Sequence, residues 1–233
     1  PGNYLEGSGM PKYKEYQKPY NLLRTAFPFS SMNISSDGNY IIGLPKTIEY
    51  PVQVFDSKTG LGISSTGFYE DLIYDVAIKR YSDTLLTVGE EGVSLWKTST
   101  GDLIKKIEYP PALTVGLENQ RYARDLIHRD KPSACFNPEG TFILSHIGNE
   151  CFIWEIKSGK LLHVLGPRNN TVFTAKLNAS NTNVLTVSDD MNARIWDFKK
   201  GKVEWSKPEI SSASWSPNGQ SILTFYTSPK NIQ

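Results

Sequence analysis

Short runs of apolar residues alternate with polar turns along almost the whole chain from residue 28 onward. The runs are rich in Val, Ile, Leu, Phe and Tyr, and short runs of this kind bounded by turn residues predict β-strands. The turns at 36–38, 138–140 and 217–219 read SDG, PEG and PNG. Glycine and its polar neighbours tolerate the positive φ angles at which hairpins reverse. The pattern therefore predicts an all-β protein made of consecutive hairpins.

One strand with its turn recurs four times. In each copy the strand ends in an aromatic residue, and a glycine follows five positions later. The copies read VQVFDSKTG, VSLWKTSTG, CFIWEIKSG and ARIWDFKKG. The aromatic residues are Phe55, Trp96, Trp154 and Trp196. They lie 41, 58 and 42 residues apart. The middle interval is one unit plus an insertion of roughly 16 residues, because a period of about 40–45 residues predicts one four-stranded blade of a β-propeller.

We expect four strands in each unit, named a to d from the propeller axis outward. In that order they are 32–34, 40–44, 52–55 and 62–66; then 73–78, 84–88, 93–96 and 103–107; then 133–136, 142–145, 151–154 and 161–165; then 172–177, 184–188, 193–196 and 203–205. Neighbouring blades cover both faces of a c strand, and alternate side chains of a strand point to opposite faces. Ile195 is therefore expected to face one neighbour and Trp196 the other, and the four aromatic rings are expected to fill the wedge between blades.

The dipeptide at the end of each c strand resembles the signature of the WD-repeat family. Trp196-Asp197 is the naming dipeptide itself, and the third and first copies, with Trp-Glu and Phe-Asp, are near variants. Trp96-Lys97 lacks the acid. The resemblance covers residues 28–233 and implies a WD-repeat β-propeller.

The resemblance also implies a buried polar network in well-formed repeats. It joins an aspartate in the b–c turn, a histidine before strand a, a serine or threonine on strand b and the tryptophan on strand c. Ser188, Asp190 and Trp196 match three of these positions in the fourth unit. The histidine is missing, because Gly166 is followed by Pro167. We expect these residues to stabilise the blade and to have no direct functional role.

A fifth unit begins near residue 211, with the a and b strands of another blade. Gly140 precedes Trp154 by 14 residues, so Gly219 predicts an aromatic residue near position 233, where the sequence reads NIQ. We therefore expect four and a half blades of a larger ring. Propellers close with about 4–8 blades, and we predict seven here. Residues 20–27 are expected to supply a closing strand to the last blade.

Residues 1–27 form an N-terminal arm before the blades, which occupy residues 28–233. Residues 1–9 are either part of the protein or a cloning remnant that precedes a native start at Met10. The arm interleaves basic and aromatic residues, namely Lys12, Tyr13, Lys14, Tyr16, Lys18 and Tyr20. An arm of this kind can be a solvated tail or an RNA contact.

Composition narrows the classes of partner. The formal net charge is +1, so no global field attracts nucleic acid or anionic membranes. No apolar run approaches the roughly 18 residues that a membrane span needs. Cys135 and Cys151 are expected on strands a and c of one blade, roughly 9–10 Å apart and beyond disulfide reach. Two free thiols predict an intracellular protein, cytoplasmic or alternatively nuclear.

Apart from the repeat pattern, the sequence contains no motif that identifies an enzyme. His128-Arg129-Asp130 resembles a kinase catalytic loop, but a kinase needs an asparagine five residues after the aspartate, where this chain has Cys135. His146 and His163 show no metal-ligand spacing with each other or with the cysteines. We therefore predict a protein that is not an enzyme and that uses no cofactor, no metal and no small-molecule substrate.

The insertion at residues 109–132 is the one irregular feature. Its segment GLENQRYARDLIHR predicts a short helix. Arg121, Tyr122, Arg124 and Arg129 are residue types enriched where proteins contact partners, so we predict a partner-binding segment. The alternative is a surface loop that tolerates extra length. The resemblance implies that it lies on the same rim as the b–c turns.

These observations predict a non-catalytic scaffold that assembles partner proteins on the propeller loops. One alternative is a regulatory or sensor propeller of a larger enzyme or signalling protein. A second alternative is a subunit of an RNA-processing or ribonucleoprotein assembly. The fold alone does not choose between these functions.

Overall fold

A computed structural model of the chain describes residues 28–35, 37–47, 50–67, 73–89, 91–110, 132–167 and 169–226. Within these ranges every regular element is a β-strand. Blade 1 contains β1 (Phe29–Ile34), β2 (Tyr40–Pro45), β3 (Gln53–Asp56) and β4 (Gly62–Ser65). Blade 2 contains β5 (Asp75–Ile78), β6 (Thr84–Val88), β7 (Gly92–Lys97) and β8 (Leu103–Glu108). The N-terminal arm, with the expected closing strand at 20–27, lies outside the described residues.

The remaining strands continue the same order. Blade 3 contains β9 (Ser133–Phe136), β10 (Phe142–Ile147), β11 (Glu150–Glu155) and β12 (Leu161–Leu165). Blade 4 contains β13 (Val172–Leu177), β14 (Asn183–Ser188), β15 (Ala193–Asp197) and β16 (Lys202–Lys207). A fifth sheet consists of β17 (Ile210–Trp215) and β18 (Ile222–Tyr226). The predicted strands and the first two strands of a fifth unit are thus present.

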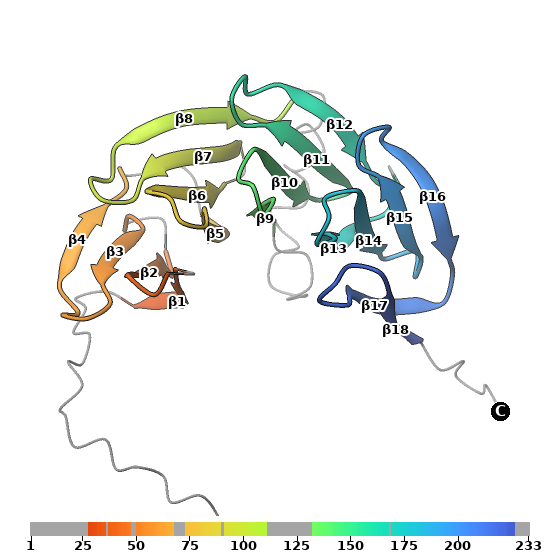
Figure 1. Ribbon diagram of the computed structural model, residues 1–233, viewed down its shortest axis with the longest axis horizontal. Helices are drawn as coiled ribbons and strands as arrows, with labels where there is room; N and C mark the ends of the chain where they lie inside the picture. The colour runs from red at the N-terminus through yellow and green to blue at the C-terminus, as the bar shows by residue number, and fades with distance from the viewer. Residues whose placement is uncertain are drawn as a thin grey trace, which may run out of the picture.

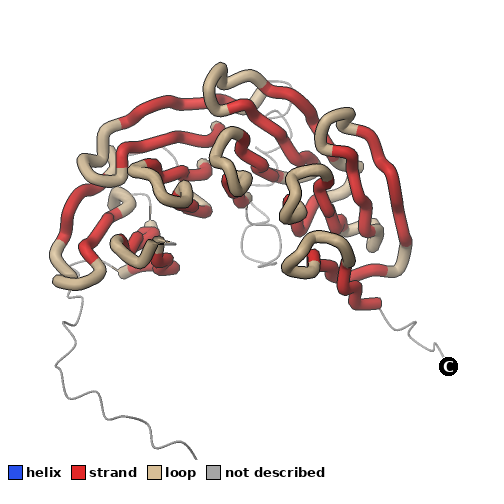
Figure 2. Tube along the Cα trace, viewed as in Figure 1, coloured by secondary structure: helices blue, strands red, loops and turns tan. Residues whose placement is uncertain are grey.

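Each full blade is an antiparallel sheet in which consecutive strands pair. The sheets follow one another along an arc, with the first strand of each sheet on the inner side and the fourth on the outer side (Figure 1). Strands make up most of the trace, and the loops join them at their ends (Figure 2). This arrangement is the WD-type propeller that the sequence predicts.

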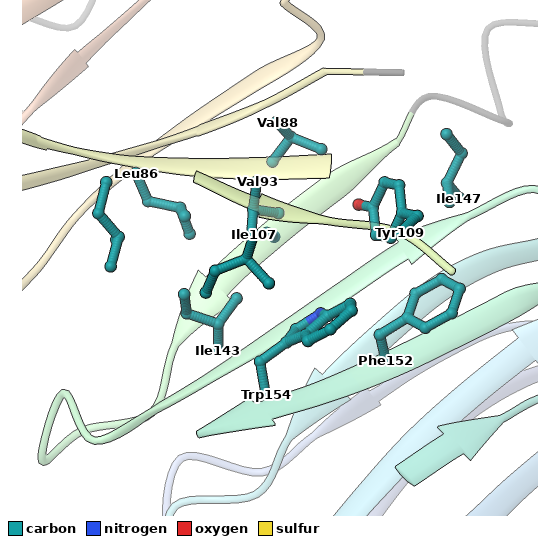
Figure 3. Packing of buried hydrophobic residues seen from close by; sticks show 11 residues of the cluster. Leu86, Val88, Val93, Ile107, Tyr109, Ile143, Ile147, Phe152 and Trp154 are labelled. Carbon is teal, nitrogen blue, oxygen red and sulfur yellow. The ribbon is translucent and has the colours of Figure 1, made fainter. Parts of the chain in front are cut away.

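The hydrophobic core lies between the blades, not inside one of them. Each c-strand tryptophan packs in a cluster shared with the preceding blade, while the residue before it packs toward the following blade. The three pairs are Trp96 with Leu95, Trp154 with Ile153, and Trp196 with Ile195. Figure 3 shows the cluster between blades 2 and 3, with Trp154 beside Phe152 and Tyr109. The expected alternation on the c strand is confirmed.

The glycine that follows each aromatic residue by five positions lies in the c–d turn, and the geometry of that turn explains why it is glycine. Gly101 has a φ of +79°, and its N–H donates to the Lys97 carbonyl at 2.7 Å. A Cβ at this position would overlap the backbone carbonyl of Ser65 in the preceding blade. Only glycine combines this left-handed backbone with so close an approach. The turn therefore sets the distance between neighbouring blades.

The outer strand of each blade also reaches the c–d turn of the next blade. The Ser64 hydroxyl donates to the carbonyl of Thr98 at 2.5 Å. Lys105 Nζ donates to the carbonyl of Ile156 at 3.2 Å. His163 Nε2 lies 2.8 Å from the carbonyl oxygen of Lys199, and it is the donor because a carbonyl only accepts. These bonds join the blades at the periphery.

Candidate functional site

Two kinds of loop share the rim at which a partner is expected. Backbone bonds link the residues that follow a d strand to the b–c turn beside it. Tyr109 N donates to Glu91 O at 2.7 Å, and Ile210 N donates to Met191 O at 2.8 Å. The d–a connections and the b–c turns therefore form one rim, which we call the insertion rim. The a–b and c–d turns form the opposite rim.

Tyr109 anchors the start of the insertion on this rim. Its side chain is buried, and its ring centroid lies 4.9 Å from that of Phe152 and 6.2 Å from that of Trp154. Burial raises the pKa of the Tyr109 phenol, and the neighbouring Ser145 hydroxyl opposes that shift only in part. A neutral phenol wedged against blade 3 fixes the point at which the insertion leaves blade 2. The sequence pattern did not single out this tyrosine as an anchor, although it directly follows the d strand.

The residues predicted to contact a partner lie beyond this anchor. Arg121, Tyr122, Arg124 and Arg129 are outside the described residues, as is the expected short helix. Their role therefore stays a prediction. The described residues place both ends of the insertion. Tyr109 at its start and Pro132 at its end are both buried.

A buried serine–histidine pair follows directly where the insertion enters blade 3. Ser133 Oγ and His146 Nε2 lie 2.8 Å apart across β9 and β10. Burial lowers the pKa of His146 to about 4, so the imidazole is neutral near pH 7. Neutral histidine next to a hydroxyl is one half of a nucleophilic arrangement.

The other half of such an arrangement would be an acid that orients the histidine. The Asp75 carboxylate lies on the neighbouring inner strand, where it accepts from Val76 N at 2.9 Å and Ala134 N at 3.3 Å. Burial raises the pKa of Asp75. Among the described residues no hydrogen bond joins Asp75 to His146. The serine–histidine pair is thus a buried contact between strands, which fits a structural role.

Each c-strand tryptophan is held by a hydroxyl on the adjacent b strand. Trp96 Nε1 donates to Thr87 at 2.9 Å, and Trp154 Nε1 donates to Ser145 at 3.0 Å. Trp196 Nε1 donates to Thr186 at 2.8 Å. All three bonds are buried, so each indole N–H is satisfied within the core.

This geometry corrects the network expected in blade 4. Thr186, not Ser188, accepts from Trp196, and the buried Ser188 hydroxyl has no hydrogen-bond partner among the described residues. The reason is the strand register. Trp196 pairs with Val184, and Thr186 is the diagonal neighbour two residues along the same face. Ser188 lies a further two residues away, beyond the reach of the indole.

Asp190 is engaged locally and does not contact the tryptophan. Its carboxylate forms a bidentate ion pair with Arg194 across the b–c turn and accepts from Asn192 N at 3.1 Å. These bonds to Arg194 and Asn192 lower the pKa of Asp190 against the effect of burial. Asp190 therefore stabilises the turn between β14 and β15.

The two cysteines are free thiols, as predicted. Burial raises the pKa of Cys135 to about 11 and raises that of Cys151 further. In the described ranges, no group of three or more His, Cys, Asp and Glu side chains is arranged to hold a metal ion. The same ranges contain no helix long and apolar enough to cross a membrane.

Comparisons with known proteins agree with this architecture. The family described as "WD domain, G-beta repeat" matches residues 159–197, which run from the c–d turn of blade 3 to the c strand of blade 4. THO complex subunit 6 of Arabidopsis thaliana is 31% identical over 67 residues, which is 28% of this chain and 18% of that protein. Autophagy-related protein 16 of Arabidopsis thaliana is 25% identical over 128 residues, covering 54% of this chain and 22% of that protein.

The matched segments span less than a quarter of the length of either relative. The evidence for the family is therefore the repeat itself. Four c strands carry an aromatic residue at the same place, one position before the strand ends; the four complete sheets have four antiparallel strands each; and the family match falls on one complete repeat. Residues 159–197 thus match the WD-repeat family, and the chain has the repeats and the blade architecture of a WD-type β-propeller, of which four blades and the first two strands of a fifth are described.

Proposed function

We propose that the chain is a non-catalytic scaffold that holds protein partners on the insertion rim, with residues 109–132 as the main contact. The observation that carries this proposal is the anchored start of the insertion. Tyr109 is fixed in the core between blades 2 and 3, and Pro132 at the other end of the insertion is buried as well. A rigid base with an added segment is a common design for binding loops.

The rigidity of the base supports the same proposal. The tryptophan bonds in blades 2 to 4 are buried, and the clusters between blades leave little room for movement. A preorganised surface avoids the cost of ordering that a flexible one must meet on binding. One relative is named as a subunit of a complex, which favours a role in assembly. WD repeats serve as protein-interaction modules in general.

The two alternatives from the sequence remain open as predictions. A sensor domain of a larger protein and a ribonucleoprotein subunit both fit a propeller. The intracellular location, cytoplasmic or nuclear, also remains a prediction that the free thiols support.

The test is affinity purification with the full chain as bait, alongside a variant in which residues 112–130 are replaced by a short Gly-Ser linker. We expect a protein partner that the full chain retains and the variant loses. The matched control is Lys199→Ser with Lys200→Ser, which changes exposed residues on the opposite rim. Circular dichroism of each bait confirms that the blades are folded.

Equal recovery of the partner by the bait and the linker variant would remove the insertion from the proposal. A finer variant, Arg121→Ser with Arg124→Ser and Arg129→Ser, tests the predicted side chains. Nuclease treatment before elution separates the protein scaffold from the ribonucleoprotein alternative, since only binding through RNA is lost.

A further inference from the structure

Arg80 and Tyr81 form a prominent pair on the rim opposite to the insertion. They occupy the a–b turn of blade 2, between β5 and β6. Tyr81 is 75% exposed, the largest value among the exposed apolar and aromatic side chains of the described residues. Tyrosine and arginine are residue types that contribute most to binding energy when a partner buries them. The pair is therefore a candidate contact surface.

The backbone at Tyr81 is unusual for a large side chain. Its φ is +50°, in the left-handed region. The a–b turns of blades 1 and 3 place Gly38 and Gly140 in that region, at +71° and +64°. A non-glycine residue there costs roughly 1–2 kcal/mol. The turn keeps a tyrosine at this cost although no core contact requires the ring, and such strain is concentrated at functional positions.

The turn is clamped, so the pair has a fixed position. The Asp83 carboxylate accepts from Ser99 N at 2.7 Å and from the Ser99 hydroxyl at 2.5 Å. The Asp83 carbonyl accepts from Thr98 N at 3.2 Å. These bonds tie the a–b turn to the c–d turn of the same blade. The ring and the guanidinium of the pair therefore rise from a rigid base.

The Tyr81 ring orients the Arg80 guanidinium, but the guanidinium N–H groups have no hydrogen-bond acceptor among the described residues. Its carbon lies 5.0 Å from the centroid of the Tyr81 ring, a cation–π arrangement. Among the described residues it forms no ion pair and no hydrogen bond. A guanidinium held by a ring keeps its N–H groups available to a carboxylate, which it can bind with two parallel hydrogen bonds.

The groups around the pair leave the Arg80 guanidinium available to an acidic ligand. Lys97 is exposed beside the turn. The two nearby carboxylates are already engaged, Asp83 with Ser99 and Asp102 with the Thr100 hydroxyl at 2.6 Å. Both carboxylates keep their negative charge, but among the described residues neither forms an ion pair with Arg80, so the Arg80 N–H groups stay open to a partner.

We propose that Arg80 and Tyr81 are a docking point for an acidic peptide segment of a partner protein. A carboxylate of the segment binds the Arg80 N–H groups, and an adjacent apolar side chain packs on the exposed part of the Tyr81 ring. This site lies on the opposite rim from the insertion, so it extends the proposed function and stands or falls separately from it.

Fluorescence anisotropy with the full chain tests the site. The probe is a short fluorescein-labelled peptide in which Asp and Glu alternate with Leu, and its counterpart carries Asn and Gln instead. We expect the acidic peptide to bind and the amide peptide to bind at least roughly ten-fold more weakly, the factor typical of a hydrogen-bonded charge. Arg80→Gln should lose a similar factor, and Arg80→Lys should fall between the two because it lacks the planar fork.

Tyr81→Gly separates binding from folding. Glycine relieves the left-handed strain, so the melting temperature should stay the same or rise while the peptide affinity falls. Lys160→Gln, an exposed change on the same rim in blade 3, should leave the affinity unchanged. The linker variant of residues 112–130 should also bind normally, which distinguishes this site from the insertion. The proposal is overturned if wild type does not bind the acidic peptide, if both peptides bind equally, or if Arg80→Gln and Tyr81→Gly bind as wild type does.

Discussion

Trp196 and Thr186 are joined by a buried hydrogen bond of 2.8 Å from the indole Nε1 to the hydroxyl. The same relationship holds between tryptophan and hydroxyl in blades 2 and 3. The ring fills the space against the preceding blade, and the hydroxyl satisfies the only polar group that the ring carries into the core. The tryptophan side chain therefore packs two blades together, and its one polar group is hydrogen-bonded within its own blade.

Thr186→Val should destabilise the protein by about 1–3 kcal/mol, because it keeps the shape of the side chain and leaves a buried indole N–H unpaired. Urea unfolding monitored by tryptophan fluorescence measures the change. Thr186→Ser is the control, since it keeps the acceptor and should recover most of the loss. Equal stability of the Val and Ser variants would mean that the bond contributes little.

Ser188→Ala should behave differently from Thr186→Val, although both remove a buried hydroxyl from β14. Within the part of the chain that the structure describes, the Ser188 hydroxyl has no hydrogen-bond partner, so removing it should be neutral or slightly stabilising. The same unfolding experiment gives the answer. A loss comparable with that of Thr186→Val would restore Ser188 to the network that the sequence predicted.

Blade 1 lacks both members of the tryptophan–hydroxyl pair. Phe55 replaces the tryptophan, and Gly43 stands on β2 at the position of the hydroxyl residue. The Phe29 ring takes the space, 6.0 Å from the Phe55 ring and edge-on to it. The phenylalanine ring carries no N–H and therefore needs no acceptor. The loss of the indole N–H on β3 is thus matched by the loss of the hydroxyl on β2.

Gly43→Ala should therefore destabilise blade 1 by about 1–3 kcal/mol through overpacking. The new Cβ would lie 2.6 Å from the Phe29 ring. A double-mutant cycle with Phe29→Leu checks the cause, because a smaller side chain should make the alanine more acceptable. Additive effects of the two substitutions would show that Phe29 is not the obstacle.

Much of the fold could be predicted because the repeat combines strong signals of several kinds. The aromatic residue lies one position before the end of a strand, and glycine is required where the turn approaches the preceding blade, as Gly101 approaches Ser65. Those constraints are local in the chain, so they are visible in the sequence. The a strand of blade 1 was harder to delimit. It begins at Phe29, three residues before the expected start, because the ring of Phe29 packs on Phe55.

The polar details were less predictable, although a signal existed. The accepting hydroxyl lies nine residues before Trp96 and Trp154 and ten before Trp196. That offset depends on the length of the b–c turn and on diagonal contact across two strands, which a family pattern applied to one blade does not resolve. The Arg80–Tyr81 pair could not be predicted at all, since a positive φ at a tyrosine and a stacked guanidinium depend on the folded turn.

The buried histidine of blade 3 makes stability depend on pH. The pKa of His146 is about 4 in the folded protein, below the ordinary value of 6.5. A lowered pKa means that the unfolded chain binds the proton more readily, so stability is complete above about pH 6.5 and decreases as the pH falls toward 4. The loss between pH 7.5 and pH 5 should be about 2 kcal/mol, from 1.36 kcal/mol for each unit of pKa difference.

Urea unfolding at a series of pH values between 7.5 and 4.5 measures this slope. His146→Gln removes the titrating group and should be less stable at pH 7.5, because its amide meets Ser133 in a different geometry. Its stability should nevertheless change less than that of wild type over the same range. If His146→Gln kept the full slope, the acid sensitivity would come from other groups, with the buried carboxyl of Asp75 excluded because its raised pKa acts in the opposite direction.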